Sequence, residues 1–365
     1  MKKTFVAAAV LGALAGSAFA ADVTLYGVID TGFNWTQTKT TGSSAVDKFS
    51  MASGQNSGPR FGLKGTEDLG DGWKVGFNLE NSFKSDTGSL DKGNRLFHRE
   101  ALLFVQSPYG ELSMGRTGAL DAGTGRYNLM GSNATPFGTG LDTIGASTLI
   151  LKGTGSRMDN TVTYKSPTFA GVTVYAQASL KKSDIDDTGA AVAGQEGSSD
   201  AERYYGLGAK FSAEGLNAGL VFSTTDYART DVKQDDDDNG YVVSGFVNYD
   251  FGMVKPMLAA QYWNNGDKLT AGKKAGTKGY GVELGATAPV LGGTIKAAAG
   301  WNDYENVADS NKDGNNWLVG VSYEYKLSKR TTLYTGAGYS EVKTKETKTT
   351  KTKTTEVLAG LVHTF

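Results

Sequence analysis

The sequence predicts an all-β protein, a sixteen-stranded antiparallel transmembrane β-barrel with short turns at one end and long loops at the other. Three observations lead to this fold class: a two-residue alternation of apolar and polar residues, an alternation of short and long connections, and the composition. The 365 residues include 50 glycines, 17 tyrosines and only 6 prolines. Strands of about 9–11 residues cross a bilayer when tilted, and their alternation averages to a polar value, here a mean hydropathy of −0.32.

The first twenty residues have the layout of an export signal. Lys2 and Lys3 precede an apolar run from Phe5 to Leu14, and Ala18-Phe19-Ala20 is a small-residue cleavage site. The apolar run is too short for a membrane-spanning helix. We therefore expect residues 1–20 to be a cleaved signal peptide that directs export through the Sec pathway, and residues 21–365 to form one barrel domain.

Segments with the alternation of a strand recur along the rest of the chain. In one of them Trp73, Val75, Phe77 and Leu79 alternate with Lys74, Gly76, Asn78 and Glu80. Similar segments begin near Val23, Val172, Tyr205, Tyr241, Tyr280 and Trp317. A period of two residues is the pattern of a strand with one apolar and one polar face.

The connections between these segments fall into two classes. Seven are short: 68–72, 107–110, 166–171, 213–215, 250–252, 289–293 and 328–330. Eight are long and polar: 36–56, 84–94, 117–156, 181–202, 226–239, 264–278, 302–315 and 341–354. Fifteen connections join sixteen strands. Bacterial barrels have short periplasmic turns and long extracellular loops, so we expect the same arrangement here.

A soluble β-sandwich is the alternative, because its strands also alternate. It predicts turns of mixed length at both ends and inward faces apolar enough to pack a core. If the polar faces look inward instead, sixteen closed strands enclose an aqueous channel. Aromatic residues near the expected strand ends favour a membrane interface, although ordinary sheet aromatics would also explain many of them: Tyr26, Trp35, Trp73, Tyr164, Tyr175, Tyr249, Tyr262, Trp263, Trp301, Trp317 and Tyr334.

Several classes of function find no support. The formal net charge of −1 does not suggest a nucleic-acid partner. The chain has no cysteine, and its two histidines, His98 and His363, lie far apart in sequence, so we expect neither an enzyme nor a cofactor. Asp309, Asn311 and Asp313 follow the first half of a calcium loop, but Gly320 stands at the twelfth position where that loop needs a glutamate. They remain a weak metal candidate, and a solvated turn is the simpler interpretation.

Four segments and the last residue carry a family resemblance. They are residues 25–30 (Leu-Tyr-Gly-Val-Ile-Asp), 60–72 (from Arg60 to Gly72), 157–164 (from Arg157 to Tyr164), 323–333 (from Tyr323 to Leu333) and the terminal Phe365. Together they resemble the trimeric Gram-negative general diffusion porins of the Neisseria and Burkholderia type. The final strand departs slightly from that family, since Thr364 replaces a more common basic residue.

The resemblance implies a function and an assembly. It implies a homotrimer in the outer membrane of a Gram-negative bacterium, acting as a passive, water-filled channel for small hydrophilic solutes and ions. It also implies that the third long loop folds into the lumen opposite a ladder of basic residues, with Arg60, Arg99 and Arg157 at the ladder positions. Phe365 would be the assembly signal that the barrel insertion machinery reads.

The third long loop, 117–156, is poor in charge and rich in apolar residues, which suits a loop packed inside a barrel. A surface or trimer-contact loop is the alternative. Arg116 precedes the loop, and Arg126, Asp121 and Asp142 lie on it, so we expect these residues at the constriction too. Arginines stay charged at working pH, and a basic ring favours anions. We therefore expect a weak anion preference, unless each arginine is merely ion-paired.

Two rival functions share this fold class. One is a substrate-specific channel with a binding track of aromatic residues, and the other is a structural or adhesive barrel whose loops bind a partner. A lysine and threonine stretch at 343–353 is expected to form a mobile last loop. It could contact anionic lipopolysaccharide. Asp235 to Asp238 is expected to be a solvated loop tip.

Overall fold

The computed structural model describes residues 23–92, 95–141, 144, 147–151, 156–186, 189–192, 194–227, 239–265, 276–307 and 309–365. The expected signal peptide, Asp142 and the acidic run at 235–238 lie outside the described residues.

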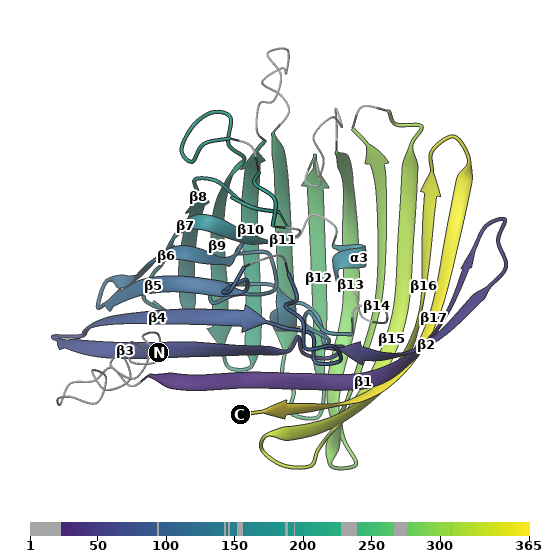
Figure 1. Cartoon of the computed structure of the whole chain (residues 1–365), viewed down its shortest axis with the longest axis horizontal. Helices are drawn as coiled ribbons and strands as arrows, with labels where there is room; N and C mark the ends of the chain where they lie inside the picture. The colour runs from purple at the N-terminus through teal and green to yellow at the C-terminus, as the bar shows by residue number, and fades with distance from the viewer. Residues whose placement is uncertain are drawn as a thin grey trace, which may run out of the picture.

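The described chain is almost entirely β-structure (Figure 1). The strands are β1 (Thr24–Thr40), β2 (Val46–Ser53), β3 (Arg60–Gly70), β4 (Trp73–Ser82), β5 (Glu100–Ser107), β6 (Gly110–Gly118), β7 (Arg157–Lys165), β8 (Val172–Ser179), β9 (Arg203–Ala213), β10 (Leu216–Asp226), β11 (Gly240–Tyr249), β12 (Lys255–Asn264), β13 (Thr277–Val290), β14 (Gly293–Asn306), β15 (Asp313–Lys326), β16 (Thr331–Lys345) and β17 (Thr349–Thr364). Two short helical pieces, η1 (Gly131–Asn133) and α3 (Ser147–Ile150), lie in the connection between β6 and β7. No helix in the described part of the chain is long and apolar enough to cross a membrane.

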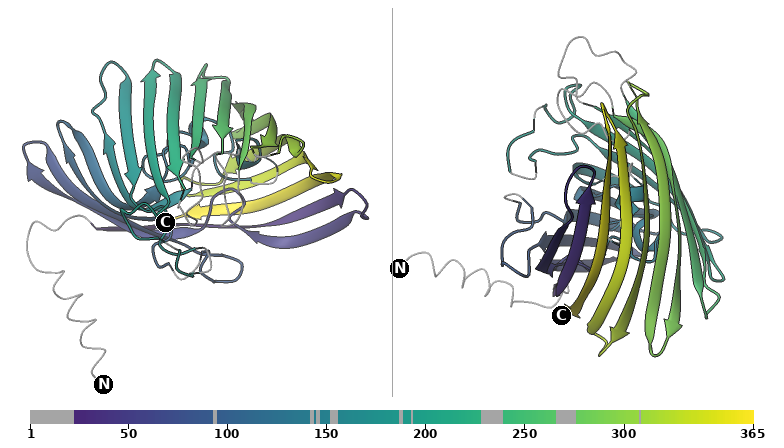
Figure 2. Two further views of the ribbon diagram at one scale, coloured as in Figure 1. Left: turned by 90° about the horizontal axis from the view of Figure 1, so that it is seen from above. Right: turned by 90° about the vertical axis from the view of Figure 1, so that its right-hand side faces the viewer.

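Strands that follow one another in sequence pair antiparallel, except β2 and β3, and β17 pairs with β1, so the sheet closes on itself. The seam runs over thirteen residue pairs, from Val28 opposite Thr364 to Thr40 opposite Thr352. In Figure 2 the yellow C-terminal strands accordingly lie beside the purple β1. β2 and β3 both pair with β1, at its two ends, and are the halves of one strand interrupted at 54–59. The barrel therefore has sixteen strands, as the connections predict.

The two faces of the sheet differ in polarity. Leu, Val and Phe side chains on one face are exposed, for example Leu207, Leu284 and Val319. The other face carries polar groups such as Ser244, Gln261 and Asn302, which are buried. The backbone of the β6–β7 connection accepts hydrogen bonds from Asn302, so the polar face is the inside of the barrel. A polar interior is the arrangement of a transmembrane barrel, and it excludes the soluble sandwich.

Three of the expected long loops, 36–56, 302–315 and 341–354, are shorter than predicted, because strand structure continues into them. β1 and β2 form a hairpin that leaves only residues 41–45 between them. The lysine and threonine stretch at 343–353, expected to be a mobile loop, is instead the tip of the β16–β17 hairpin, with Lys343 opposite Lys351 and Thr344 opposite Thr350. β-branched threonines favour strands, and this preference outweighs the low complexity of the segment.

Four of the eleven aromatic residues assigned to the interface point inward instead. Trp263, Tyr175 and Tyr334 are buried on the inner face. Tyr26 also faces inward, where its hydroxyl donates to Glu80 over 2.9 Å. On the outer face, the ring centres of Tyr280 and Trp301 lie 5.5 Å apart, and those of Trp317 and Tyr339 lie 5.0 Å apart. Such aromatic pairs are expected of an aromatic girdle.

Candidate functional site

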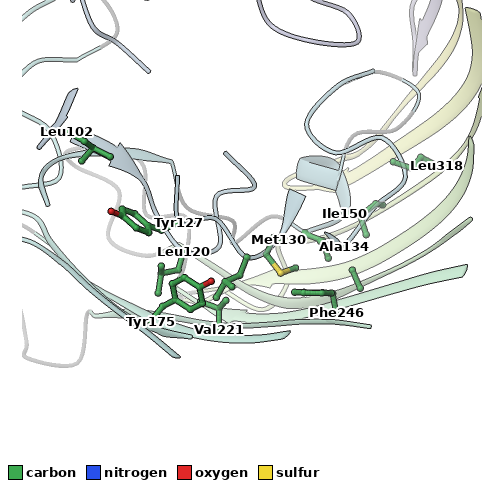
Figure 3. Close-up of a cluster of buried hydrophobic side chains, with 13 residues drawn as sticks. Leu102, Leu120, Tyr127, Met130, Ala134, Ile150, Tyr175, Val221, Phe246 and Leu318 are labelled. Carbon is green, nitrogen blue, oxygen red and sulfur yellow. The ribbon is translucent and has the colours of Figure 1, made fainter. Parts of the chain in front are cut away.

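The connection between β6 and β7, residues 119–156, is called the inner loop below. Its apolar side chains pack against residues of the barrel wall (Figure 3). In one cluster Leu120, Met130 and Ile150 of the loop meet Val221 of β10 and Phe246 of β11. In a second cluster Phe137, Leu141 and Ile144 of the loop meet Ala298, Tyr334, Leu358 and Val362 of β14, β16 and β17. Such burial stabilises a loop by roughly 1.5–3 kcal/mol for each large apolar side chain, so this loop is held inside the barrel.

Polar contacts hold the same loop against the inner face of the wall. Asn302 donates to the carbonyl oxygens of Leu149 and Ile150 at 2.7 and 3.0 Å. Asn248 donates to the carbonyl oxygen of Asn133 at 2.7 Å. Because these backbone groups lie away from bulk water, each needs a partner. Asparagines of the wall supply these partners to the loop backbone.

Glycines on the inner face of β13 to β16 let the loop approach the backbone. A Cβ added at Gly320 would lie 1.9 Å from the carbonyl oxygen of Ile144, and one added at Gly300 would lie 2.7 Å from Cγ1 of Ile150. Any side chain at Gly320 would therefore displace the loop. The high glycine content of the sequence has a specific cause at these positions.

Arg60 and Arg99 share one carboxylate. Arg99 is ion-paired with Glu80 through its Nε, and the Nε of Arg60 lies 3.7 Å from the other carboxylate oxygen of Glu80. Arg60 also donates to the carbonyl oxygen of Gly58 at 3.0 Å. The two guanidiniums lie close enough to repel each other. One negative charge therefore balances two positive charges on this part of the wall.

Arg157, at the start of β7, is the third member of the ladder. Its Nε is buried and has no hydrogen-bond partner among the described residues. The charges of Arg99 and Arg116 repel it, and those of Glu80 and Glu100 attract it. Arg60, Arg99 and Arg157 thus form one electrostatically connected group, which we call the arginine ladder.

Arg116, also expected at the constriction, belongs to a different network. Its guanidinium is ion-paired with Asp159, and its Nε donates to the carbonyl oxygen of His98 at 2.7 Å. Arg95 binds both carboxylate oxygens of Asp159, at 2.8 and 2.7 Å, and also donates to the carbonyl oxygen of Ile185. This network ties the β4–β5 connection to the β8–β9 connection, and one carboxylate serves two arginines in it, as Glu80 does for Arg60 and Arg99.

Arg126 holds the beginning of the inner loop to the wall. It donates to both carboxylate oxygens of Glu111 at 2.7 and 2.9 Å, and its guanidinium lies 3.9 Å from the ring centre of Phe104. Burial opposes its charge, but these hydrogen bonds raise the pKa of Arg126. Burial and the hydrogen bond to Glu111 raise the pKa of Tyr127. Arg126 is therefore a permanent anchor rather than a free cation.

Two other expected groups are placed away from the ladder. Asp121 is 1% exposed and accepts a hydrogen bond from Ser223 over 2.9 Å. Asp313 of the weak calcium candidate is ion-paired with Lys345 at 3.2 Å, while Asp309 accepts from the backbone of Asn311. Among the described residues no group of three or more histidine or carboxylate side chains could hold a metal ion.

Sequence reasoning missed the acidic partners Glu80, Glu111 and Asp159. Glu100 is buried and accepts from the backbone of Arg126 at 2.6 Å and from Thr117 at 2.9 Å. For Glu80 a signal existed: pairing across the short turn at 68–72 places it opposite Gly62, on the same face as Arg60. For Asp159 no such signal existed, because Arg95 lies in an irregular connection and Arg116 lies at the register shift between β6 and β7.

Comparisons with known proteins agree with this architecture. The family model of the Gram-negative porins matches residues 7–345. An outer membrane porin protein of Bordetella pertussis is 31% identical, over 93% of this chain and 94% of its own length. The major outer membrane protein P.IB of Neisseria gonorrhoeae is 27% identical, over 93% of each chain.

Solved structures show the same fold. The anion-selective porin from Comamonas acidovorans superimposes with a TM-score of 0.69 at 22% identity, covering 94% of this chain and all of that one. The outer membrane channel DcaP of Acinetobacter baumannii gives a TM-score of 0.65 at 18% identity, covering 94% and 97%. The closed barrel, its polar interior and these matches lead to one conclusion: the chain belongs to the Gram-negative porins and is a β-barrel protein of the outer membrane.

Proposed function

We propose that this chain is a general diffusion porin, a passive, water-filled channel for small hydrophilic solutes and ions with a weak preference for anions. One observation carries the proposal. The beginning of the inner loop is held to β5 and β6 through Arg126, and most of its apolar side chains pack along β8 to β17, whereas the arginine ladder arises from β3, the β4–β5 connection and β7. A solute that passes between loop and wall therefore meets the ladder.

The charge balance of the ladder sets the sign of the preference. Arg60, Arg99 and Arg157 face Glu80 and the buried Glu100, which leaves an excess of one positive charge. A unit charge about 8 Å from a passing ion changes its energy by about 0.5 kcal/mol in water and about 2 kcal/mol at an effective dielectric constant of 20. Salt screens this interaction further. The preference is therefore modest, and the anion-selective porin from Comamonas acidovorans offers a precedent on the same fold.

The assembly follows from family membership in the same way. We propose a homotrimer in contact with outer-membrane lipid and lipopolysaccharide, inserted by the barrel insertion machinery through Phe365. The long loops would face the outside of the cell, as is general for bacterial barrels.

A planar lipid bilayer tests the channel. The purified, detergent-extracted oligomer should insert with conductance steps of uniform size, and the current through each step should depend linearly on voltage. A current that saturates with one added solute would favour a substrate-specific channel over general diffusion. Complete absence of conductance from correctly folded protein would refute the porin function and leave the structural or adhesive barrel.

A further inference from the structure

Glu283 is a buried carboxyl group that plays no part in the arginine ladder. It lies in the middle of β13, on the inner face of the barrel, and is 0% exposed. Neither of its two carboxyl oxygens has a hydrogen-bond partner among the described residues. Glu80 and Glu111, by contrast, each hold an arginine. In the part of the chain that the structure describes, Glu283 is therefore a buried titratable group without a counter-ion.

The inner loop covers this carboxyl group. Gly281 and Gly285 flank Glu283 on the same face of the strand. A side chain added at Gly281 would clash with the carbonyl oxygen of Ile150, and one added at Gly285 would clash with the ring of Pro136. Loop and strand are thus in close contact on both sides of Glu283. Displacement of this part of the loop would bring the carboxyl group into contact with water.

Thr135 of the inner loop is the polar side chain that faces Glu283. Its hydroxyl group interacts with the carboxyl group, although the two do not reach the geometry of a full hydrogen bond. Thr135 is itself buried. The stretches of loop that cover the carboxyl group, 131–138 and 147–151, carry no charged side chain. The loop therefore offers Glu283 a hydroxyl group but no positive charge.

The neighbouring strands offer no positive charge to Glu283 either. Its partners in register are an alanine on β12 and a glycine on β14. The charged side chains on the inner faces of these strands are Lys255 of β12 and Lys296 of β14, and both lie opposite Thr287. Thr287 is four residues from Glu283, or about 13 Å along the strand. Lys296 is moreover already ion-paired.

An ionised carboxylate is unfavourable in such a place. A charge that is removed from water and has no counter-ion is costly, and a carboxyl group so placed takes up a proton instead. The protonated form carries one O–H donor, and the hydroxyl oxygen of Thr135 is an acceptor beside it. The proton on Glu283 and the contact between loop and strand therefore favour each other.

We infer that Glu283 and Thr135 form a proton-operated latch, which holds the inner loop on β13 while Glu283 carries a proton and releases this part of the loop when the carboxyl group ionises. On release, the proton passes to the water that enters beside the carboxylate. Because the closed form keeps the proton, raising the pH favours the open form and lowering the pH favours the closed form. The inference rests on the position of the inner loop and not on ion selectivity.

The test measures how often the loop opens, through a single introduced thiol, since the chain has no cysteine of its own. Ala134→Cys places the thiol beside Thr135, at a buried position. Its rate of reaction with a water-soluble maleimide is measured on the folded, detergent-solubilised full protein at a series of pH values, with and without Glu283→Gln. Ionisation of the thiol affects both proteins equally, so the ratio of the two rates reports the latch.

This ratio, without Glu283→Gln over with it, should be constant in acid. It should then rise by up to about tenfold for each pH unit once Glu283 ionises, because opening releases one proton. Glutamine is neutral at every pH, so the Glu283→Gln protein should stay closed. Thr135→Val removes the hydroxyl group at nearly the same side-chain shape and should raise the labelling rate in acid several-fold.

Ala119→Cys is the matched control, because Ala119 is a buried alanine at the beginning of the inner loop, packed against Met158 and Tyr204. Its labelling ratio should not change with pH. A constant ratio at Ala134→Cys would overturn the inference, and so would an equal rise at both positions or an unchanged acid rate in Thr135→Val. Labelling that follows added sodium or calcium ions instead of pH would also overturn it. Conductance of the wild type tests the porin function separately.

Discussion

Glu80 lies between two guanidiniums, and this single carboxylate decides how much of their charge a solute meets. It pairs with Arg99 and attracts Arg60, while Arg157 has no ion-pair partner among the described residues. The three arginines are therefore not equivalent. Among the described residues no carboxylate forms an ion pair with Arg157, whereas neutralising Arg99 also removes one of the two partners of Glu80.

Removing a positive charge at Arg157 and removing a negative charge at Glu80 should have opposite effects on ion selectivity. Arg157→Gln should lower the ratio of chloride to potassium permeability roughly twofold, and Glu80→Gln should raise it by a similar factor, since one charge about 8 Å away is worth about 0.5 kcal/mol in water. Reversal potentials in a salt gradient measure both. Lys329→Gln, in an exposed short turn, is the control for loss of charge alone. Shifts of the same sign in the two variants would contradict the proposed ladder.

Family resemblance suggested ladder positions for Arg60, Arg99 and Arg157, which stay a prediction, but it did not suggest their acidic partners. Glu80 pairs with Gly62, two residues from Arg60 on the same face, so their proximity follows from the register of one short hairpin. Arg116 and Arg126 were expected to line the constriction, yet Asp159 and Glu111 hold them. Those partners depend on bulges and irregular connections, such as the register shift between Gly115 and Thr117, which no local pattern encodes.

At the scale of elements, the inner loop is the part of the chain whose position matters most for the channel. Its low charge predicted an interior location, and the packing of Ile144 and Ile150 agrees with that prediction. Its path along β8 to β17 was not predictable, because it depends on where inner-face glycines leave room. The β16–β17 hairpin shows the opposite case: strand propensity was present in the sequence, but the low complexity of 343–353 concealed it.

Gly320 provides a direct test of the loop position. In Gly320→Val the new side chain would meet the carbonyl oxygen of Ile144, and such overpacking typically costs about 1–3 kcal/mol. We expect faster tryptic cleavage within residues 119–156 and a lower unfolding temperature, with the barrel still closed. Gly245→Ala is the matched control, because the nearest atom to its added Cβ is 3.5 Å away. Equal cleavage rates in the two variants would show that the loop does not rest on β15.

At the scale of the whole molecule, closure depends on the seam between the first and last strands. Phe365 exchanges two backbone hydrogen bonds of 3.1 Å with Gly27, and its ring covers that glycine so closely that a Cβ there would lie 2.3 Å from the ring. The last residue therefore belongs to the closed barrel itself, in addition to its proposed role as an assembly signal.

Phe365→Ala should reduce the yield of folded barrel in the outer membrane several-fold, since it removes a ring contact worth about 1 kcal/mol as well as the proposed signal. The fraction of heat-modifiable protein on an unheated gel measures this yield. Phe251→Ala changes an exposed phenylalanine in a short turn and should have no effect. Refolding of both variants in detergent separates the two roles of Phe365, because only the stability role should persist without the insertion machinery.

The reversal potential of the wild-type channel in a potassium chloride gradient tests the central claim most directly. A water-filled lumen with one excess positive charge at its ladder predicts a measurable current. Its reversal potential should have the sign of the chloride equilibrium potential and be much smaller in magnitude. The reversal potential should move toward zero as the salt concentration on both sides is raised. A reversal potential on the potassium side, or no current at all, would contradict the account.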